Sequence, residues 1–166
     1  ELKNRLSETE IFSMYGLTEA VRVLYLPPEY VKQKPESVGI AIPGTEVWVE
    51  HEGVRLGHGE VGELVVRGRH VMRGYWEAPE LTAKRFRPCG FPGERVCYTD
   101  DLFKTDEEGF FYFVGRKDDI IKSRGEKVAP REVECVLHTL TGIIEAAVIG
   151  IPDPILGQAI KAFVVR

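Results

Sequence analysis

Short apolar runs, separated by glycine and proline, occur throughout the first two thirds of the chain. The runs at residues 46–50, 62–67 and 110–114 contain β-branched or aromatic residues and are bounded by turn residues. This pattern predicts the strands of an antiparallel sheet or barrel-like layer. The apolar residues at 11–14 predict a further, buried strand. Residues 79–86 predict one short helix, because proline is tolerated in the first turn of a helix.

The pattern changes after Gly115. Residues 130–140 have apolar positions at helical spacing and a proline near the start, so we predict a helix there. Residues 143–150 and 159–165 predict two strands, joined by a turn at the Pro-Asp-Pro sequence of residues 152–154. A β-rich half followed by strand, helix and two more strands predicts an α+β fold with two structural units.

The break between the two halves lies at residues 115–119, where a glycine and four successive charged residues interrupt the apolar pattern. We therefore predict a β-rich unit over residues 1–115 and a small α+β unit over residues 116–166. The second unit is very short for an independent domain. It also ends at a strand, and the chain begins without methionine. We therefore expect the chain to be a piece of a longer protein.

Charge and composition exclude several classes of function. The net charge of -4, with both signs mixed along the chain, argues against a nucleic-acid-binding protein. No apolar run is long enough to span a bilayer, so we expect no transmembrane segment. The three cysteines form no CxxC pair and favour a reducing cytoplasm over a disulfide framework. The four histidines lack the spacing of metal ligands.

The sequence Tyr-Gly-Leu-Thr-Glu at residues 15–19 is the first stretch that could carry chemistry. The ring of Tyr15 can stack on a flat base, and Gly16 lets the backbone approach a ligand closely. The hydroxyl of Thr18 can bond a phosphate oxygen, and the carboxylate of Glu19 can bind Mg²⁺. An ordinary strand-to-loop turn with a solvated Glu19 explains the same five residues equally well.

Two adjacent carboxylates, Asp100 and Asp101, precede an apolar run. Neighbours on a strand point to opposite faces, so only one of them can face a given ligand. One carboxylate can accept two hydrogen bonds from a vicinal diol such as a ribose. The alternative is a hairpin end with solvated aspartates. The stretches at residues 60–68, 71–76 and 82–86, by contrast, predict scaffold, and we assign them no catalytic role.

Charged residues gather at the predicted joint between the units. Arg116 has permanently charged donors that suit phosphate or sugar oxygens. Residues 120–125 form a short apolar segment followed by a basic, glycine-bearing loop. Such a loop can cover an anionic ligand and let a thin chain pass close to the backbone. The alternative is the charged tip of a β-hairpin.

Taken together and in this order, these stretches resemble the adenylate-forming superfamily of acyl-CoA synthetases, peptide-synthetase adenylation domains and luciferases. The resemblance rests on YGLTE at residues 15–19, GELVVRG at 62–68, YTDD at 98–101 and GRKDDIIKSRGEKVAPREVE at 115–134. It implies a β-rich, barrel-like end of the large N-terminal domain. A hinge would join this part to the start of a small, mobile α+β C-terminal domain.

The resemblance implies an acid–thiol ligase that uses ATP, Mg²⁺ and coenzyme A. A carboxylic acid attacks the α-phosphate of ATP to give an acyl-adenylate and pyrophosphate, and CoA then displaces AMP to give a thioester. Residues 120–130 are more similar to acid–CoA ligases of fatty-acid and aryl-acid types than to peptide-synthetase domains, which indicates fatty acid metabolism. The alternatives are an enzyme that loads a carrier protein and a non-catalytic nucleotide-binding or interaction module.

The resemblance also implies roles for individual residues. The nucleotide-binding residues are Tyr15 against adenine, Gly16, Thr18 at the phosphates, Asp101 and Arg116 at the ribose, with Glu19 as the magnesium ligand. The hinge is Asp118, and the path of CoA contains Lys122, Arg124 and Gly125. Thr18, Glu19 and Lys122 are the implied catalytic residues. Asp100 stands where the family usually has glycine, which adds a negative charge near the nucleotide.

Other catalytic parts of the family lie outside this chain. The phosphate-binding loop and most of the acyl pocket lie upstream, and the lysine that catalyses adenylation lies downstream. Stabilisation of the pentacoordinate phosphate depends on that lysine. We therefore expect the chain by itself to be inactive or nearly so.

Overall fold

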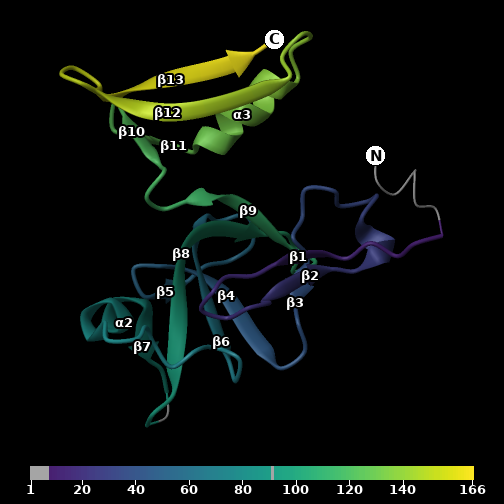
Figure 1. Cartoon of the computed structure of the whole chain (residues 1–166), viewed down its shortest axis with the longest axis vertical. Helices are drawn as coiled ribbons and strands as arrows, with labels where there is room; N and C mark the ends of the chain where they lie inside the picture. Colours follow the sequence, from purple (N-terminus) through teal and green to yellow (C-terminus); the bar gives the residue numbers. More distant parts are fainter. Residues whose placement is uncertain (1–7, 91) are drawn as a thin grey trace. The chain divides into compact units, whose positions relative to one another are not determined.

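The computed structural model of the protein describes residues 8–90 and 92–166 (Figure 1). The described chain divides into two compact units. The first contains the residues up to Thr99 together with Phe103–Phe113, and the second contains Asp100–Leu102 and Val114–Arg166. The domain boundary after Gly115 stays a prediction. Each unit is described by itself below.

A curled half-barrel sheet forms the main part of the first unit, as the barrel-like pattern predicted (Figure 1). Among the described residues its strand order is β5-β4-β6-β8-β7, with β9 paired to β8. The strands are β4 (Thr45–His51), β5 (Val54–Arg55), β6 (Gly62–Gly68), β7 (Phe86–Pro88), β8 (Arg95–Thr105) and β9 (Phe111–Arg116). The predicted strands at 46–50, 62–67 and 110–114 correspond to β4, β6 and β9.

A smaller antiparallel sheet precedes it, formed by β1 (Ser13–Tyr15), β2 (Leu24–Leu26) and β3 (Ile40–Ala41), with a 3₁₀ turn at Pro28–Tyr30. The prediction that the strand at 11–14 is buried was wrong. The side chains of Phe12 and Met14 are both 48% exposed. The physical reason is that β1 is a short outer strand, paired only with β2 among the described residues.

The core of the first unit lies against the inner face of the half-barrel. Leu24, Leu64 and Phe103 are fully buried there. Along β8 the buried positions alternate with less buried ones, at Cys97, Thr99, Asp101 and Phe103. Asp101 is therefore on the inward side of the strand, as the alternation rule requires. The short helix α2 (Pro79–Arg85) covers the residues predicted to be helical except Phe86, which begins β7, and none of its residues is fully buried.

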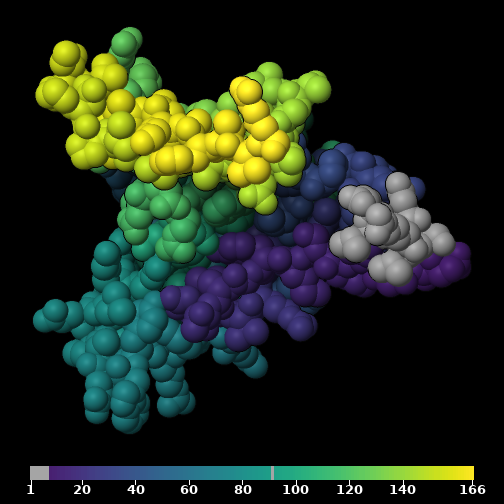
Figure 2. Space-filling view, turned by 45° about the horizontal axis from the view of Figure 1, so that its top comes forward, coloured from purple at the N-terminus to yellow at the C-terminus, as the bar shows by residue number. Residues whose placement is uncertain are grey.

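The second unit contains an antiparallel sheet in the order β11-β10-β13-β12. Its strands are β10 (Ile121–Ser123), β11 (Glu126–Val128), β12 (Glu145–Asp153) and β13 (Gly157–Val165). The surfaces of β12 and β13 are visible in yellow tones in Figure 2. Helix α3 (Pro130–His138) is tied to this sheet, because the backbone N–H of Val148 donates to Oε1 of Glu134 at 2.9 Å.

The turn between β12 and β13 lies later than predicted. Pro152 and Asp153 still belong to β12, and the chain reverses between Asp153 and Gly157. Oδ1 of Asp153 accepts hydrogen bonds from the backbone N–H groups of Ile155 and Leu156, at 2.8 and 2.7 Å. These two bonds hold the pKa of Asp153 below its ordinary value. Such side-chain bonds to the backbone two and three residues on are typical of aspartate turns.

No helix among the described residues is long and apolar enough to cross a membrane.

Candidate functional site

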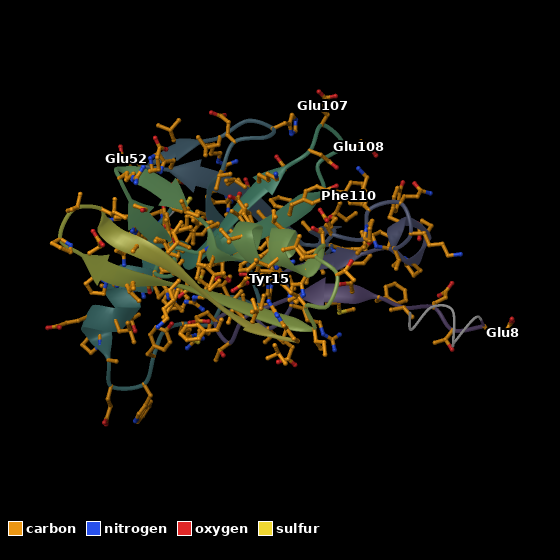
Figure 3. All side chains as sticks on the ribbon, turned by 90° about the horizontal axis from the view of Figure 1, so that it is seen from above. Glu8, Tyr15, Glu52, Glu107, Glu108 and Phe110 are labelled. Atoms are coloured by element: carbon orange, nitrogen blue, oxygen red, sulfur yellow. The ribbon has the colours of Figure 1, made fainter. Side chains whose placement is uncertain are left out.

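Tyr15, labelled in Figure 3, is the last residue of β1, and Gly16 follows it where the chain turns toward β2. The ring of Tyr15 meets the ring of Phe103 edge-on, with ring centroids 5.0 Å apart and planes inclined by 70°. A Cβ atom on Gly16 would lie 1.8 Å from the carbonyl oxygen of Val21. Only glycine therefore fits this turn.

The loop that follows Gly16 presents Thr18 and Glu19 differently. Thr18 is exposed, whereas the side chain of Glu19 is only 13% exposed. The hydroxyl of Tyr75 donates to Oε1 of Glu19, and Nε of Arg85 lies 3.9 Å from the same oxygen. The backbone carbonyl of Glu19 also accepts a hydrogen bond from the N–H of Met72 at 2.9 Å. The interpretation of Glu19 as a solvated side chain in a simple turn is therefore wrong.

Burial, together with the hydrogen bond to Glu19, raises the pKa of Tyr75 above its ordinary value. The nearby guanidinium of Arg85 opposes this shift. The phenol thus stays protonated and serves as a donor to the carboxylate. The sequence pattern predicts only scaffold at residues 71–76 and 82–86, so it does not identify Tyr75 and Arg85 as functional residues. No local pattern marks them, because they meet Glu19 only through a long-range contact.

Asp101 and Arg116, both assigned to the ribose, lie together within the second unit. Nε of Arg116 is 3.8 Å from Oδ1 of Asp101, and the two side chains are 48% and 12% exposed respectively. The alternative of a hairpin end with solvated aspartates is wrong for Asp101, which is in the middle of β8. Its neighbour Asp100 has a φ of 57°, in the left-handed region. Glycine adopts this conformation freely, which accounts for the glycine that the resemblance implies at this position.

The remaining predicted residues belong to a turn and a hairpin in the second unit. Asp118 is exposed in the turn that follows β9, where the N–H of Asp119 donates to the carbonyl of Arg116 at 3.1 Å. Lys122, on β10, is exposed and pairs across the hairpin with Lys127.

The tip of this hairpin is formed by Arg124 and Gly125, with φ of 53° and 84°. Positive φ at both positions is typical of a two-residue type I′ turn. The N–H of Lys122 donates to Oε1 of Gln158 at 2.7 Å, and that of Arg124 donates to the carbonyl of Leu156 at 2.9 Å. The basic segment is therefore a hairpin tip that is held by β13 and by the turn that precedes β13.

The candidate residues thus form two sets. Tyr15, Gly16, Thr18 and Glu19 lie together in the first unit. Asp101, Arg116, Asp118, Lys122, Arg124 and Gly125 lie in the second unit. Within the second set, Asp101 and Arg116 are in contact, and Lys122, Arg124 and Gly125 share one hairpin.

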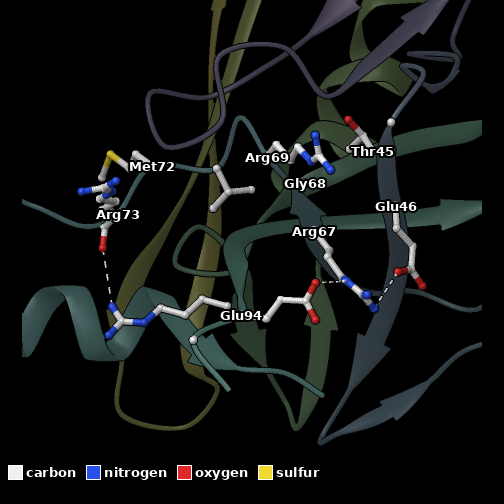
Figure 4. A pocket seen from close by; sticks show the side chains of 12 residues that line it. Thr45, Glu46, Arg67, Gly68, Arg69, Met72, Arg73 and Glu94 are labelled. Atoms are coloured by element: carbon white, nitrogen blue, oxygen red, sulfur yellow. Dashed lines mark hydrogen bonds and ion pairs between the residues drawn. The ribbon is translucent and has the colours of Figure 1, made fainter. Parts of the chain in front are cut away.

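A cavity of about 900 Å³ in the first unit contains none of these residues (Figure 4). Three of its charged side chains pair with one another. Arg67 lies between two carboxylates, with Nε 3.1 Å from Oε1 of Glu94 and a terminal nitrogen 3.2 Å from Oε2 of Glu46. The guanidinium of Arg95 donates to the carbonyl of Arg73 at 3.5 Å. The contacts of Glu19 and Asp101, and not this cavity, define the candidate site.

The described residues bring no three His, Cys, Asp or Glu side chains together around a possible metal ion. A magnesium ion held mainly by nucleotide phosphates needs only one or two protein carboxylates. Glu19 fits such a site, because its two partners both meet Oε1 and leave Oε2 for a metal.

Comparison with known proteins agrees with these motifs. Residues 1–76 match the model of the family described as AMP-binding enzyme, and residues 132–166 match the AMP-binding enzyme C-terminal domain. A long-chain-fatty-acid–CoA ligase of Bacillus subtilis (strain 168) is 41% identical over 153 residues, covering 91% of this chain and 26% of the ligase. The chain belongs to the AMP-binding enzyme family. The predicted resemblance is therefore confirmed.

Solved structures of similar enzymes support the same assignment. The amide bond synthetase McbA from Marinactinospora thermotolerans is 35% identical with a TM-score of 0.82, covering 92% of this chain and 31% of that one. The o-succinylbenzoate CoA synthetase MenE from Bacillus subtilis, in complex with the acyl-adenylate intermediate OSB-AMP, is 31% identical with a TM-score of 0.83. The alignment covers 98% of this chain and 33% of MenE. The chain thus spans about a quarter to a third of these AMP-binding enzymes.

Proposed function

We propose that this chain is part of an AMP-forming acid–CoA ligase. The full-length protein joins a carboxylic acid to the α-phosphate of ATP with release of pyrophosphate, and CoA then displaces AMP to form a thioester. The observation that carries the proposal is the pairing of Asp101 with Arg116, whose charged groups lie 3.8 Å apart. Family membership supports the same two-step reaction.

The Asp101–Arg116 pair has the chemistry needed to hold a ribose. The carboxylate of Asp101 is largely shielded from water, whereas Arg116 is half exposed. A carboxylate can accept both hydrogen bonds of a vicinal diol, and guanidinium donors can bind the same sugar oxygens. Because the pair is already assembled in the chain, little further ordering is needed when a nucleotide binds.

The loop after β1 supports contacts to the rest of the nucleotide. Phe103 fixes the ring plane of Tyr15 by an edge-on contact, which prepares a flat surface for adenine. Thr18 has an exposed hydroxyl for a phosphate oxygen. Glu19 offers a carboxylate oxygen for magnesium, which when bound offsets the charge of the phosphates.

The β10–β11 hairpin supports a role in thioester formation. Lys122 and Arg124 are exposed cations that suit the phosphates of CoA. Gly125 has open space on the side where a side chain would stand, so it leaves backbone accessible to the narrow pantetheine chain. The turn around Asp118 connects β9 to this hairpin and is the proposed pivot between the two half-reactions.

The acid and the acceptor are proposed from the relatives. The Bacillus subtilis relative is named for long-chain fatty acids, which supports a fatty acid as substrate and a role in fatty acid metabolism. The amide bond synthetase favours a second candidate, in which an amine replaces the thiol as acceptor. A carrier-protein thiol is the third acceptor that the same chemistry allows.

The test is a pair of half-reaction assays on the full-length protein. Acid-dependent exchange of pyrophosphate into ATP measures adenylation, and consumption of CoA thiol measures transfer. We expect both activities, and we expect Asp101→Ala to weaken nucleotide binding in both steps. If pyrophosphate exchange occurs without thioester formation, and the acyl group is transferred to an amine or a carrier protein, then that group and not CoA is the acceptor. Absence of exchange with fatty and aryl acids would refute the proposal.

The isolated 166-residue chain provides a second test. It spans only about a quarter of the fatty-acid ligase that it resembles. We therefore propose that the isolated chain releases pyrophosphate far more slowly than the full-length protein, or not at all. A pyrophosphate-release assay on both proteins, at equal molar concentration, makes the comparison.

A further inference from the structure

The Glu19 carboxylate is held by two residues that lie far along the sequence. The hydroxyl of Tyr75 donates to Oε1, and Arg85 lies 3.9 Å from the same atom. The side chains of Glu19 and Arg85 are only 13% and 16% exposed. Both contacts therefore form in a shielded environment, where hydrogen bonds and charges act more strongly than in water.

The partners of Glu19 are themselves fixed. The N–H of Tyr75 donates to the hydroxyl of Thr82 at 2.9 Å, and its ring packs against Phe86 with centroids 5.9 Å apart. A terminal nitrogen of Arg85 donates to the carbonyl of Tyr98 at 3.0 Å. The two side chains thus form a rigid support for one oxygen of the carboxylate.

This arrangement distinguishes the two carboxylate oxygens. Oε1 is engaged by protein groups, and every contact that the described structure gives Glu19's carboxylate is made by that atom. Oε2 is left for a ligand. We propose that Tyr75 and Arg85 are positioning residues that turn Oε2 of Glu19 toward the metal ion of a bound magnesium–nucleotide complex. The inference rests on the proposed function, in which Glu19 is the magnesium ligand.

Removal of the Tyr75 hydroxyl should release the carboxylate. Glu19 could then rotate and form a two-point pair with the guanidinium of Arg85, the strongest geometry available to these groups. That pair would occupy Oε2 and compete with the metal. Groups that orient a metal ligand commonly change metal affinity by about 10- to 100-fold when they are mutated.

Tyr75→Phe in the full-length protein tests the inference, because it keeps the ring and removes only the hydroxyl. Calorimetry measures the affinity for ATP with magnesium and the affinity for AMP in EDTA. Electron paramagnetic resonance measures Mn²⁺ binding in the presence of ATP. We expect metal affinity to fall by about 10- to 100-fold, with AMP affinity in EDTA unchanged. Equal loss of both affinities, or no change in metal affinity, would overturn the inference.

Tyr98→Phe is the matched control. The hydroxyl of Tyr98 donates to Oε1 of Glu50 at 2.7 Å, so this variant also removes a tyrosine–carboxylate hydrogen bond from the first unit. We expect metal affinity to stay unchanged in Tyr98→Phe. A fall as large as that in Tyr75→Phe would mean that the effect is general destabilisation, which contradicts a positioning role.

Two further variants separate the inference from the function on which it rests. Glu19→Gln should weaken metal binding if Glu19 is the ligand, and an unchanged metal affinity would refute that function. If Glu19→Gln weakens binding but Tyr75→Phe does not, only the positioning role is refuted. Arg85→Lys keeps the charge without the planar guanidinium, so we expect a smaller fall in metal affinity. This variant also tests the inference if Tyr75→Phe fails to fold, and an unchanged affinity would overturn it.

Discussion

The carbonyl oxygen of Asp100 accepts a hydrogen bond from the backbone N–H of Lys117 at 2.8 Å. Asp100 makes this contact in a left-handed conformation, with a φ of 57°. The bond ties the middle of β8 to the first residue after β9, next to the proposed pivot at Asp118. Aspartate tolerates left-handed backbone better than most residues, but less well than glycine.

Asp100→Gly should therefore stabilise the chain. Glycine, which the resemblance implies at this position, adopts a positive φ without the steric cost of a Cβ atom. Asp100→Ala is the control, because it also removes the carboxylate but keeps the Cβ atom. We expect the free energy of unfolding of the glycine variant to exceed that of the alanine variant by about 1 kcal/mol. Urea unfolding measures the difference, and an alanine variant as stable as the glycine variant would contradict the backbone argument.

Gly16→Ala should destabilise the turn that carries Thr18 and Glu19. The new Cβ atom would lie 1.8 Å from the carbonyl oxygen of Val21, and backbone cannot yield as a flexible side chain can. We expect a loss of at least about 1–3 kcal/mol, as for overpacked sites. Thermal unfolding of Gly16→Ala and of a control, Gly57→Ala, makes the comparison. At Gly57 the nearest obstacle is the flexible end of the Glu60 side chain at 3.3 Å. Similar losses in both variants would show that the close approach is not the cause.

Local pattern predicted the elements but not the contacts between them. Alternation in β4 and helical spacing in α3 depend on neighbouring residues, so they can be recognised in the sequence. The inward direction of Asp101 follows from the same period of two. The exposure of Phe12 and Met14 depends on which strands cover β1, and the meeting of Tyr75 with Glu19 depends on the folding of distant segments. Neither the exposure of β1 nor the contact between Tyr75 and Glu19 leaves a periodic pattern in the sequence.

A cluster around Asp106 should make the stability of the first unit depend on pH. Nζ of Lys34 lies 2.6 Å from Oδ2 of Asp106, and the hydroxyl of Tyr112 donates to the same oxygen at 3.0 Å. The N–H of Phe110 donates to Oδ1 at 2.9 Å. Figure 3 shows Phe110 beside the loop that carries Glu107 and Glu108. Burial alone would raise the pKa of Asp106, but these hydrogen bonds hold it below its ordinary value.

The lowered pKa of Asp106 determines how the stability of the first unit changes with pH. A carboxyl group whose pKa is lower in the folded state contributes stability above its unfolded pKa of about 3.9. That contribution is lost as the pH falls through the lower, folded pKa. We expect Asp106→Asn to reduce stability at pH 7 and to flatten the fall in stability below about pH 4. Urea unfolding at a series of pH values from neutral to acid measures the free energy of unfolding, with Glu107→Gln in the same loop as the control. If the free energy of unfolding of Asp106→Asn falls at low pH as steeply as that of the unchanged protein, Asp106 is not the source of the pH dependence.

Lys122→Ala should separate the two half-reactions of the full-length protein. If the β10–β11 hairpin acts only when CoA attacks, loss of the Lys122 cation affects thioester formation and leaves adenylation nearly intact. Removal of a single stabilising donor commonly slows a step by about 10²-fold. Lys127→Ala is a close control, because Lys127 is the direct cross-strand neighbour of Lys122 on the same hairpin and carries the same charge.

The measurement compares pyrophosphate exchange with thioester formation in both variants. We expect Lys122→Ala to lose thioester formation selectively, and Lys127→Ala to retain both activities. Neither variant should unfold the hairpin, because both side chains are exposed and the type I′ turn at Arg124 and Gly125 is untouched. Equal losses of both half-reactions in Lys122→Ala would refute its role at the thiol. Equal selective losses in the two variants would instead assign the effect to the overall charge of the hairpin.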